Sequence, residues 1–118
     1  MFFFSDQERP MSSSAEFVEY VTENMCGAGT ISARKMFGEY GVYCNGKIVA
    51  LICDNQLFIK PTDAGRGKIP QAECASPYPG AKPYLLIGGD IIDDVERLSE
   101  LIRITADALP LPKRKRLK

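Results

Sequence analysis

The dipeptide Asn45-Gly46, which separates two runs of apolar residues, constrains the fold of this chain more than any other feature. Both central residues of a type I′ turn have positive φ, a conformation that asparagine and glycine tolerate, so the dipeptide predicts a tight β-hairpin. The turn sets the register, and the predicted pairs across the hairpin are Cys44 with Lys47, Val42 with Val49, and Tyr40 with Leu51. A hairpin of this kind excludes a helix through residues 40–52.

A second turn at Asp54-Asn55 adds a strand over residues 56–60 and completes a three-stranded antiparallel meander. The predicted pairs across this turn are Ile52 with Leu57 and Leu51 with Phe58. Side chains alternate between the faces of a strand, so the register assigns residues to faces. One face is predicted to carry Met36, Tyr40, Val42, Val49, Leu51 and Cys53, and the other Phe37, Tyr43, Ile48, Ala50 and Ile52. Because both faces are apolar, we expect helices on one and a second copy, in a symmetric homodimer, or a partner over the rest.

Helices are predicted on either side of this meander in the sequence. Ser13-Ser14-Ala15-Glu16 has capping-box spacing, and a stripe at Phe17, Val21 and Met25 follows before Gly27 and Gly29. Asp93 or Asp94 can cap a last helix that Pro110 ends. Residues 61–83 hold five of the eight prolines and predict a structured connection or short helix with loops, whereas residues 84–87 read as a strand. The pattern therefore predicts a two-layer α+β fold, with the meander and one or two further strands packed against N- and C-terminal helices.

The residue types argue against enzymatic chemistry. Histidine is absent, which removes the commonest general base and the usual nitrogen ligand of zinc. The four cysteines contain no Cys-x-x-Cys pair, and the predicted register holds Cys44 and Cys53 far apart, so we expect reduced thiols and no metal or other cofactor. Residues 65–68 (GRGK) lack the spacing of a phosphate-binding loop. The acidic cluster at Asp90, Asp93 and Asp94 could bind a divalent ion, but helix capping explains it more simply.

Charge is unevenly distributed along the chain. Residues 113–118 hold five of the 15 basic residues, whereas residues 1–112 carry 10 basic against 15 acidic residues. A basic tail of this kind can contact nucleic acid or another polyanion. A second basic pair enters the first predicted strand in aromatic company. The candidate contacts for a partner or a nucleic acid are Arg34, Lys35, Phe37, Tyr43, Lys113, Arg114, Lys115 and Arg116.

No apolar run is long enough to cross a bilayer, and no secretion signal precedes the domain, so a cytoplasmic protein without membrane contact is expected.

The stretch RKMFGEYGVYCNGKIVALICDNQLFIKP, residues 34–61, resembles the signature of the TfoX/Sxy N-terminal domain family. The resemblance extends over about residues 14–116, and Glu39 stands where the family often has glycine. It implies an antiparallel sheet packed with helices in a secretion-chaperone-like arrangement, and a link to the regulators of bacterial natural competence. Those regulators have a second, C-terminal domain, so this chain is similar to a stand-alone version. Residues 1–12 are then a disordered segment or extension, residues 13–110 the domain, and residues 111–118 a flexible basic tail.

Three functions from different classes follow from these observations. The first is a non-enzymatic regulatory or protein-interaction module with a transcription-linked partner. The second is a nucleic-acid binder that uses the basic tail, Arg34 and Lys35. The third is an enzyme or a small-ligand-binding protein with a pocket between the sheet and the helices near Tyr40, Tyr43 and Tyr78.

Overall fold

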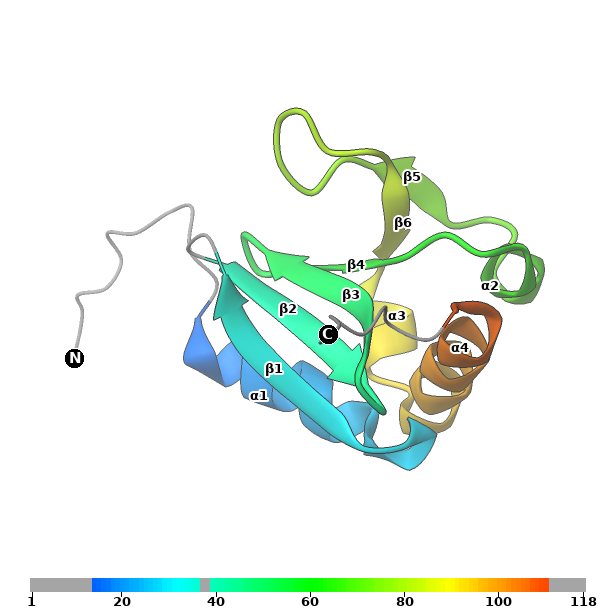
Figure 1. Cartoon of the computed structure of the whole chain (residues 1–118), viewed down its shortest axis with the longest axis horizontal. Coiled ribbons are helices and arrows are strands. Elements are labelled where there is room, and N and C mark those ends of the chain that lie inside the picture. The colour runs from blue at the N-terminus through cyan, green and yellow to red at the C-terminus, as the bar shows by residue number, and fades with distance from the viewer. Residues whose placement is uncertain (1–13, 37–38, 111–118) are drawn as a thin grey trace, which may run out of the picture.

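The structure is a computed structural model that describes residues 14–36 and 39–110 of the 118-residue chain. It is an open, six-stranded antiparallel sheet with helices against it, which confirms the predicted α+β class (Figure 1). The strands are β1 (Ile31–Met36), β2 (Glu39–Cys44), β3 (Lys47–Cys53), β4 (Gln56–Ile59), β5 (Glu73–Ala75) and β6 (Tyr84–Ile87), in the order β1-β2-β3-β4-β6-β5. The helices are α1 (Ala15–Asn24), the 3₁₀ turn η2 (Cys26–Ala28), α2 (Asp63–Lys68), α3 (Gly89–Ile92) and α4 (Val95–Ala108).

Helix α1 begins at its serine cap and ends before the predicted glycines. Ser14 is the N-cap, and its side-chain oxygen accepts a hydrogen bond from the Phe17 N–H. Val18, Val21 and Met25 point into the core, whereas Phe17 is only partly buried. At the other end of the chain, Asp94 caps α4 by accepting a hydrogen bond from the Arg97 N–H.

The two tight turns of the meander form as predicted. Asn45 and Gly46 have φ of 54° and 86°, and Asp54 and Asn55 have φ of 54° and 56°. Asn45 also fixes the segment before β1, because its Oδ1 accepts a hydrogen bond from the Thr30 N–H at 2.9 Å. Its own N–H donates to the Thr30 carbonyl at 2.8 Å. Asn45 therefore joins the β2–β3 hairpin to the segment that leads into β1.

A β-bulge in β3 corrects the predicted register. Cys44 pairs with Lys47, but Tyr43 pairs with Ile48 and Val42 pairs with Ala50, so Val49 is an extra residue on β3. Beyond the bulge, Tyr40 pairs with Ile52 instead of Leu51, whereas the pairs across the second turn are as predicted. The predicted faces were wrong from Ala50 onward, because one extra residue in a strand reverses the side on which the following side chains lie.

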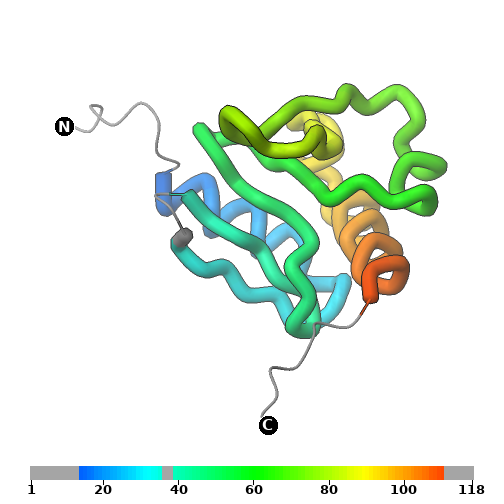
Figure 2. Tube along the Cα trace, turned by 45° about the horizontal axis from the view of Figure 1, so that its top comes forward, coloured from blue at the N-terminus to red at the C-terminus, as the bar shows by residue number. Residues whose placement is uncertain are grey.

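The helices cover one face of this sheet, which we call the inner face (Figure 1 and Figure 2). The core joins α1, α3 and α4 to inner-face residues that include Val42, Val49, Ala50, Ile52, Leu57, Ile59, Leu85 and Ile87. The opposite face, which we call the outer face, carries Tyr43, Ile48, Leu51, Cys53, Phe58, Lys60, Tyr84 and Leu86. Burying the inner face between sheet and helices removes most of the apolar surface of the meander from water.

The outer face is partly covered by the chain itself, which the sequence did not predict. Phe58 is 3% exposed and Cys53 is 5% exposed, although neither belongs to the core cluster under the helices. Tyr78, from the connection between β5 and β6, lines the same hollow as Leu51 and Cys53. Part of the cover that we expected from a second copy is thus supplied within one chain.

The other predictions have mixed outcomes. The region 61–83 contains the expected short helix, α2, but also the edge strand β5, and a further short helix, α3, follows β6. In the part of the chain that the structure describes, no helix is long and apolar enough to cross a membrane. The predicted extension at residues 1–12, the side chains of Met36 and Phe37, and the tail at residues 111–118 lie outside the described residues.

Candidate functional site

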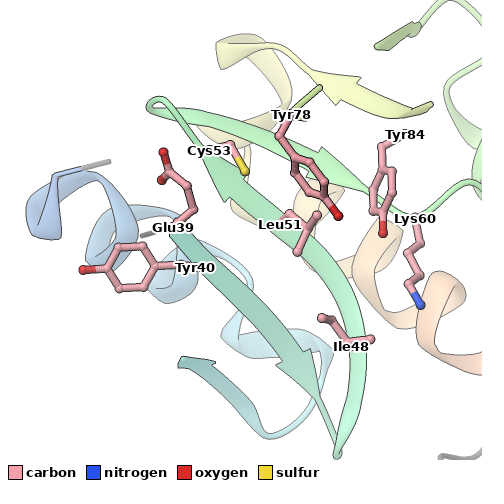
Figure 3. A pocket seen from close by; sticks show the side chains of 8 residues that line it. All are labelled: Glu39, Tyr40, Ile48, Leu51, Cys53, Lys60, Tyr78 and Tyr84. Atoms are coloured by element: carbon pink, nitrogen blue, oxygen red, sulfur yellow. The ribbon is translucent and has the colours of Figure 1, made fainter. Parts of the chain in front are cut away.

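A groove of about 630 Å³ lies on the outer face of the sheet (Figure 3). Its floor is made by Ile48 and Leu51 of β3, and Tyr78 and Tyr84 stand side by side along one wall. The remaining lining residues are Glu39, Tyr40, Cys53 and Lys60. A hollow of this size, mostly apolar with a few polar groups, has the character of a binding site.

The bulge at Val49 creates the floor of this groove. Without it, Ile48 and Leu51 would lie on opposite faces of β3, because they are three residues apart. With the extra residue between them, both face outward. Gly41 pairs with Leu51 and adds no side chain beside it, which leaves the floor open. The groove is therefore a product of strand irregularity and one glycine.

Three polar groups of the groove have distinct surroundings. Burial raises the pKa of the Cys53 thiol to about 11, and the nearby Glu39 and Asp54 carboxylates act in the same direction. Burial likewise raises the pKa of Tyr84. Both groups therefore stay protonated at neutral pH, and a neutral thiol is a poor nucleophile. At the end of the groove near β2, Glu39 Oε2 accepts a hydrogen bond of 3.1 Å from the Asp54 N–H.

Lys60 is the groove's cation. It is partly buried just after β4, and in the described part of the chain it has neither an ion pair nor a hydrogen bond from its side chain. The one ion pair within those residues joins Lys68 and Glu100, which belong to α2 and α4. The lysine stem can lie along the apolar surface while its ammonium stays in water, where it can pair with an anion from outside.

A second, smaller hollow of about 260 Å³ adjoins the groove. It shares Ile48 and Lys60 with the groove and continues to Tyr43, Gly46, Lys47, Leu109 and Pro110. The outer face thus offers a track with Glu39 and Tyr40 at one end, Lys60 in the middle beside the Tyr78 and Tyr84 wall, and the end of α4 at the other (Figure 3).

The structure brings together some of the predicted contact residues. The Arg34 guanidinium carbon lies 5.9 Å from the centre of the Tyr43 ring, within the range of a cation–π contact. Lys35 is exposed beside it on the edge strand β1, but its partner on β2 is Tyr40, so its side chain lies toward the inner side. Phe37 and the tail residues Lys113, Arg114, Lys115 and Arg116 lie outside the described residues.

The predicted pocket was placed on the wrong side of the sheet. The space between sheet and helices is filled by the core, and the hollow that contains Tyr78 lies on the outer face. Tyr40 reaches the rim of this groove while packing against the core. Sequence reasoning missed Lys60, Leu51 and Tyr84 as groove residues. Leu51 lies in the groove because of the bulge, and no residue pattern in β3 predicts that bulge.

Two other expectations concern metals and thiols. Within residues 14–36 and 39–110, no three acidic or cysteine side chains gather in a way that could hold a metal ion. Of the acidic cluster, Asp94 caps α4, and the Asp93 carboxylate accepts a hydrogen bond from the Tyr20 hydroxyl. All four cysteines are free thiols, and Cys44 donates a weak hydrogen bond to the Ala28 carbonyl.

Fold and groove together define a small α+β domain with an apolar groove on the outer face of its sheet. The family model of the TfoX N-terminal domain matches residues 23–109, so the chain belongs to this family, as its signature predicted. It is also similar to the uncharacterised 12.7 kDa protein in the trpE 5′ region of Spirochaeta aurantia. The two are 38% identical over 108 residues, which cover 92% of this chain and 93% of that protein.

Proposed function

We propose that this protein is a non-enzymatic regulatory module that acts by binding a partner protein with a role in transcription. Membership of the TfoX N-terminal domain family supports a regulatory role. The link to transcription and competence rests on the resemblance to the full-length regulators of that family. The observation that carries the binding function is the apolar groove on the outer face, with Tyr78 half exposed at its wall.

A single copy of the chain leaves the tyrosine wall of the groove accessible to a partner. Tyr78 is 54% exposed and stands beside Tyr84, over a floor of aliphatic side chains. Tyrosine rings offer a large apolar contact and a hydroxyl, with few rotatable bonds to restrict, which suits them to interfaces. A protein that docks here removes this surface from water without any chemical step.

The test is affinity capture from the organism that encodes the protein, with quantitative mass spectrometry. Tyr78→Ala removes the groove wall, and Val95→Ala is the matched control, because Val95 is 50% exposed at the start of α4. We expect a transcription-linked protein that the wild type and the Val95 variant capture and the Tyr78 variant loses. Capture of no such protein, or equal capture by both variants, would contradict the proposal.

We also propose a homodimer as the form in which the protein is active. The support is the apolar outer face, which the chain itself covers only in part, together with the commonness of symmetric pairs among homo-oligomers. Light scattering after size-exclusion chromatography should give about twice the 13.1 kDa mass of the chain at tens of micromolar. A single-chain mass at that concentration would refute the dimer and leave the binding function standing.

Direct nucleic-acid binding is the second candidate function. The observation in its favour is that Arg34 and Lys35 are exposed on edge strand β1, with Tyr43 beside Arg34. Exposed aromatic and basic side chains together can contact bases and phosphates. In a gel shift at low salt, removal of residues 113–118 and, separately, Arg34→Ala should each weaken binding to single-stranded DNA. Unchanged binding in both variants would exclude this mechanism.

A further inference from the structure

The two hollows of the outer face share one cation, Lys60. Ile48 and Lys60 line both of them; the larger hollow continues along the tyrosine wall to Glu39, and the smaller one ends at Leu109 and Pro110. Any extended ligand that fills both hollows therefore passes Ile48 and Lys60. The ligand group next to Lys60 is then an internal one, with an apolar group before it and another after it.

The charges of the track favour an anion at this place. The carboxylate that lines the groove, Glu39, lies at the opposite end from Lys60 and accepts the hydrogen bond from Asp54 (Figure 3). Lys47 of the smaller hollow donates to the carbonyls of Ala106 and Leu109, and Arg34 adds a further cation over Tyr43, which lines that hollow. The middle and the β1 side of the track are thus basic, although residues 1–112 as a whole carry more acidic than basic residues.

We propose that the track binds an extended peptide segment of a partner protein in which an acidic side chain pairs with Lys60, between two apolar side chains. An aromatic or large aliphatic side chain fills the hollow beside Tyr78 and Tyr84, and a smaller apolar side chain fills the hollow at Leu109. A charge-assisted contact in partly apolar surroundings fixes the register of the peptide, while the apolar side chains provide most of the affinity. The proposal rests on the binding function proposed above and specifies the chemistry of its partner.

Charge and shape disfavour the other occupants. The chain's own segment 113–118 carries five basic residues, which Lys60 and Arg34 repel. A second copy centred on the track would bring hollow against hollow and one Lys60 toward the other, so the homodimer proposed above would have to use outer-face surface beside the track. A small aromatic acid could occupy the larger hollow but would leave the smaller one empty.

The first experiment selects peptides from a phage-displayed library of random dodecapeptides on the full-length protein. We expect enrichment of sequences with Asp or Glu between two apolar residues. The enriched peptides should bind Lys60→Met about 10- to 100-fold more weakly, because that is the loss expected when a charge-assisted hydrogen bond is removed. Lys82→Met is the matched control, since Lys82 is an exposed lysine in the β5–β6 connection outside both hollows, and it should bind as the wild type does.

The second experiment titrates a synthetic copy of the best peptide by calorimetry. Replacement of its acidic residue by the neutral amide should cause a similar loss on the wild type and none on Lys60→Met. Absence of an acidic motif, or an equal loss in the Lys82 variant, would overturn the proposal. Binding of 2-naphthoate as tight as that of the peptide would also overturn it and assign the groove to a small aromatic acid.

These outcomes separate the proposal from the binding function on which it rests. Suppose that no acidic peptide binds, yet capture still yields a transcription-linked protein that Tyr78→Ala loses. The function would then stand and the partner's chemistry would be different. If acidic peptides bind through Lys60 but capture yields no such protein, the track is confirmed and the role in transcription fails.

Discussion

Lys47 should contribute more to stability than any other lysine of the described chain, although it lies next to the hairpin turn. Its ammonium group donates hydrogen bonds to the carbonyls of Ala106, at 2.7 Å, and Leu109, at 3.0 Å. Ala106 is in the last turn of α4 and Leu109 is its C-cap, so the helix does not continue past them; the Leu109 N–H donates to the Ala106 carbonyl at 3.3 Å, and the Lys47 ammonium is a further donor to it. The contact ties the tip of the β2–β3 hairpin to the end of the last helix, 59 and 62 residues away in sequence.

The perturbation is Lys47→Met, which keeps the apolar stem and removes the ammonium. A hydrogen bond to a charged group contributes about 1.5–3 kcal/mol, and a cation at a helix C-terminus about 0.3–1 kcal/mol. Water can reach the carbonyls of this partly buried end once the ammonium is gone, so we expect a loss near the low end, about 2 kcal/mol. For a domain of this size, such a loss lowers Tm by about 8 °C.

The assay is urea unfolding followed by circular dichroism, with Lys82→Met as the control. Lys82 is exposed, and its replacement should change the free energy of unfolding by less than about 0.5 kcal/mol. The midpoint should move while the slope stays constant, because the surface exposed on unfolding is nearly the same. A loss below about 0.5 kcal/mol for Lys47→Met would refute the reasoning, since the two hydrogen bonds would then have no net value.

Four further predictions test the bulge, a helix cap and, twice, the buried thiol. Ile52→Ala should lower the free energy of unfolding in urea by about 2–5 kcal/mol, clearly more than Leu51→Ala. The reason is that Ile52 is fully buried in the core whereas Leu51 lies in the groove. The reverse order would contradict the bulge. Asp94→Ala should cost about 1 kcal/mol by the same assay, through loss of the α4 cap, whereas Asp94→Asn should cost less. Cys53 should react with a thiol reagent at pH 8 far more slowly than the exposed Cys26, because Cys53 is 5% exposed and its pKa is raised to about 11. Equal rates would show that the groove opens. Because the unfolded thiol ionises before the folded one, stability should fall as the pH rises from about 9 to 11, and Cys53→Ala should flatten this fall in unfolding free energy measured across that range.

Local signals in the sequence were sufficient wherever the structure depends on residues close in the chain. Asn45-Gly46 and Asp54-Asn55 form turns because their side chains tolerate positive φ, and both hairpins have the predicted pairs next to their turns. Asp94 caps a helix for a similarly local reason, since its carboxylate reaches a backbone N–H three residues away. The family signature belongs to this same stretch, which is why the family could be recognised from residues 34–61.

The candidate site was predicted only in part. The signature drew attention to Arg34 and Tyr43, which the structure places in contact on the outer face. Lys60 was not singled out, because a lysine after a short strand usually indicates only solvent exposure. Its importance depends on Ile48 and on the end of α4, which reach it from other parts of the chain.

The sequence by itself determined the turns, the caps, the apolar strands and the family of this protein, because each of these depends on a short run of residues. The tertiary structure alone decided which face each strand residue occupies beyond Val49, and hence where the groove lies. The physical reason is that apolar residues such as Val49, Ala50 and Leu51 suit either side of a sheet equally well. The choice between the sides is made by packing against α1 and α4, and those helices lie far away in the chain.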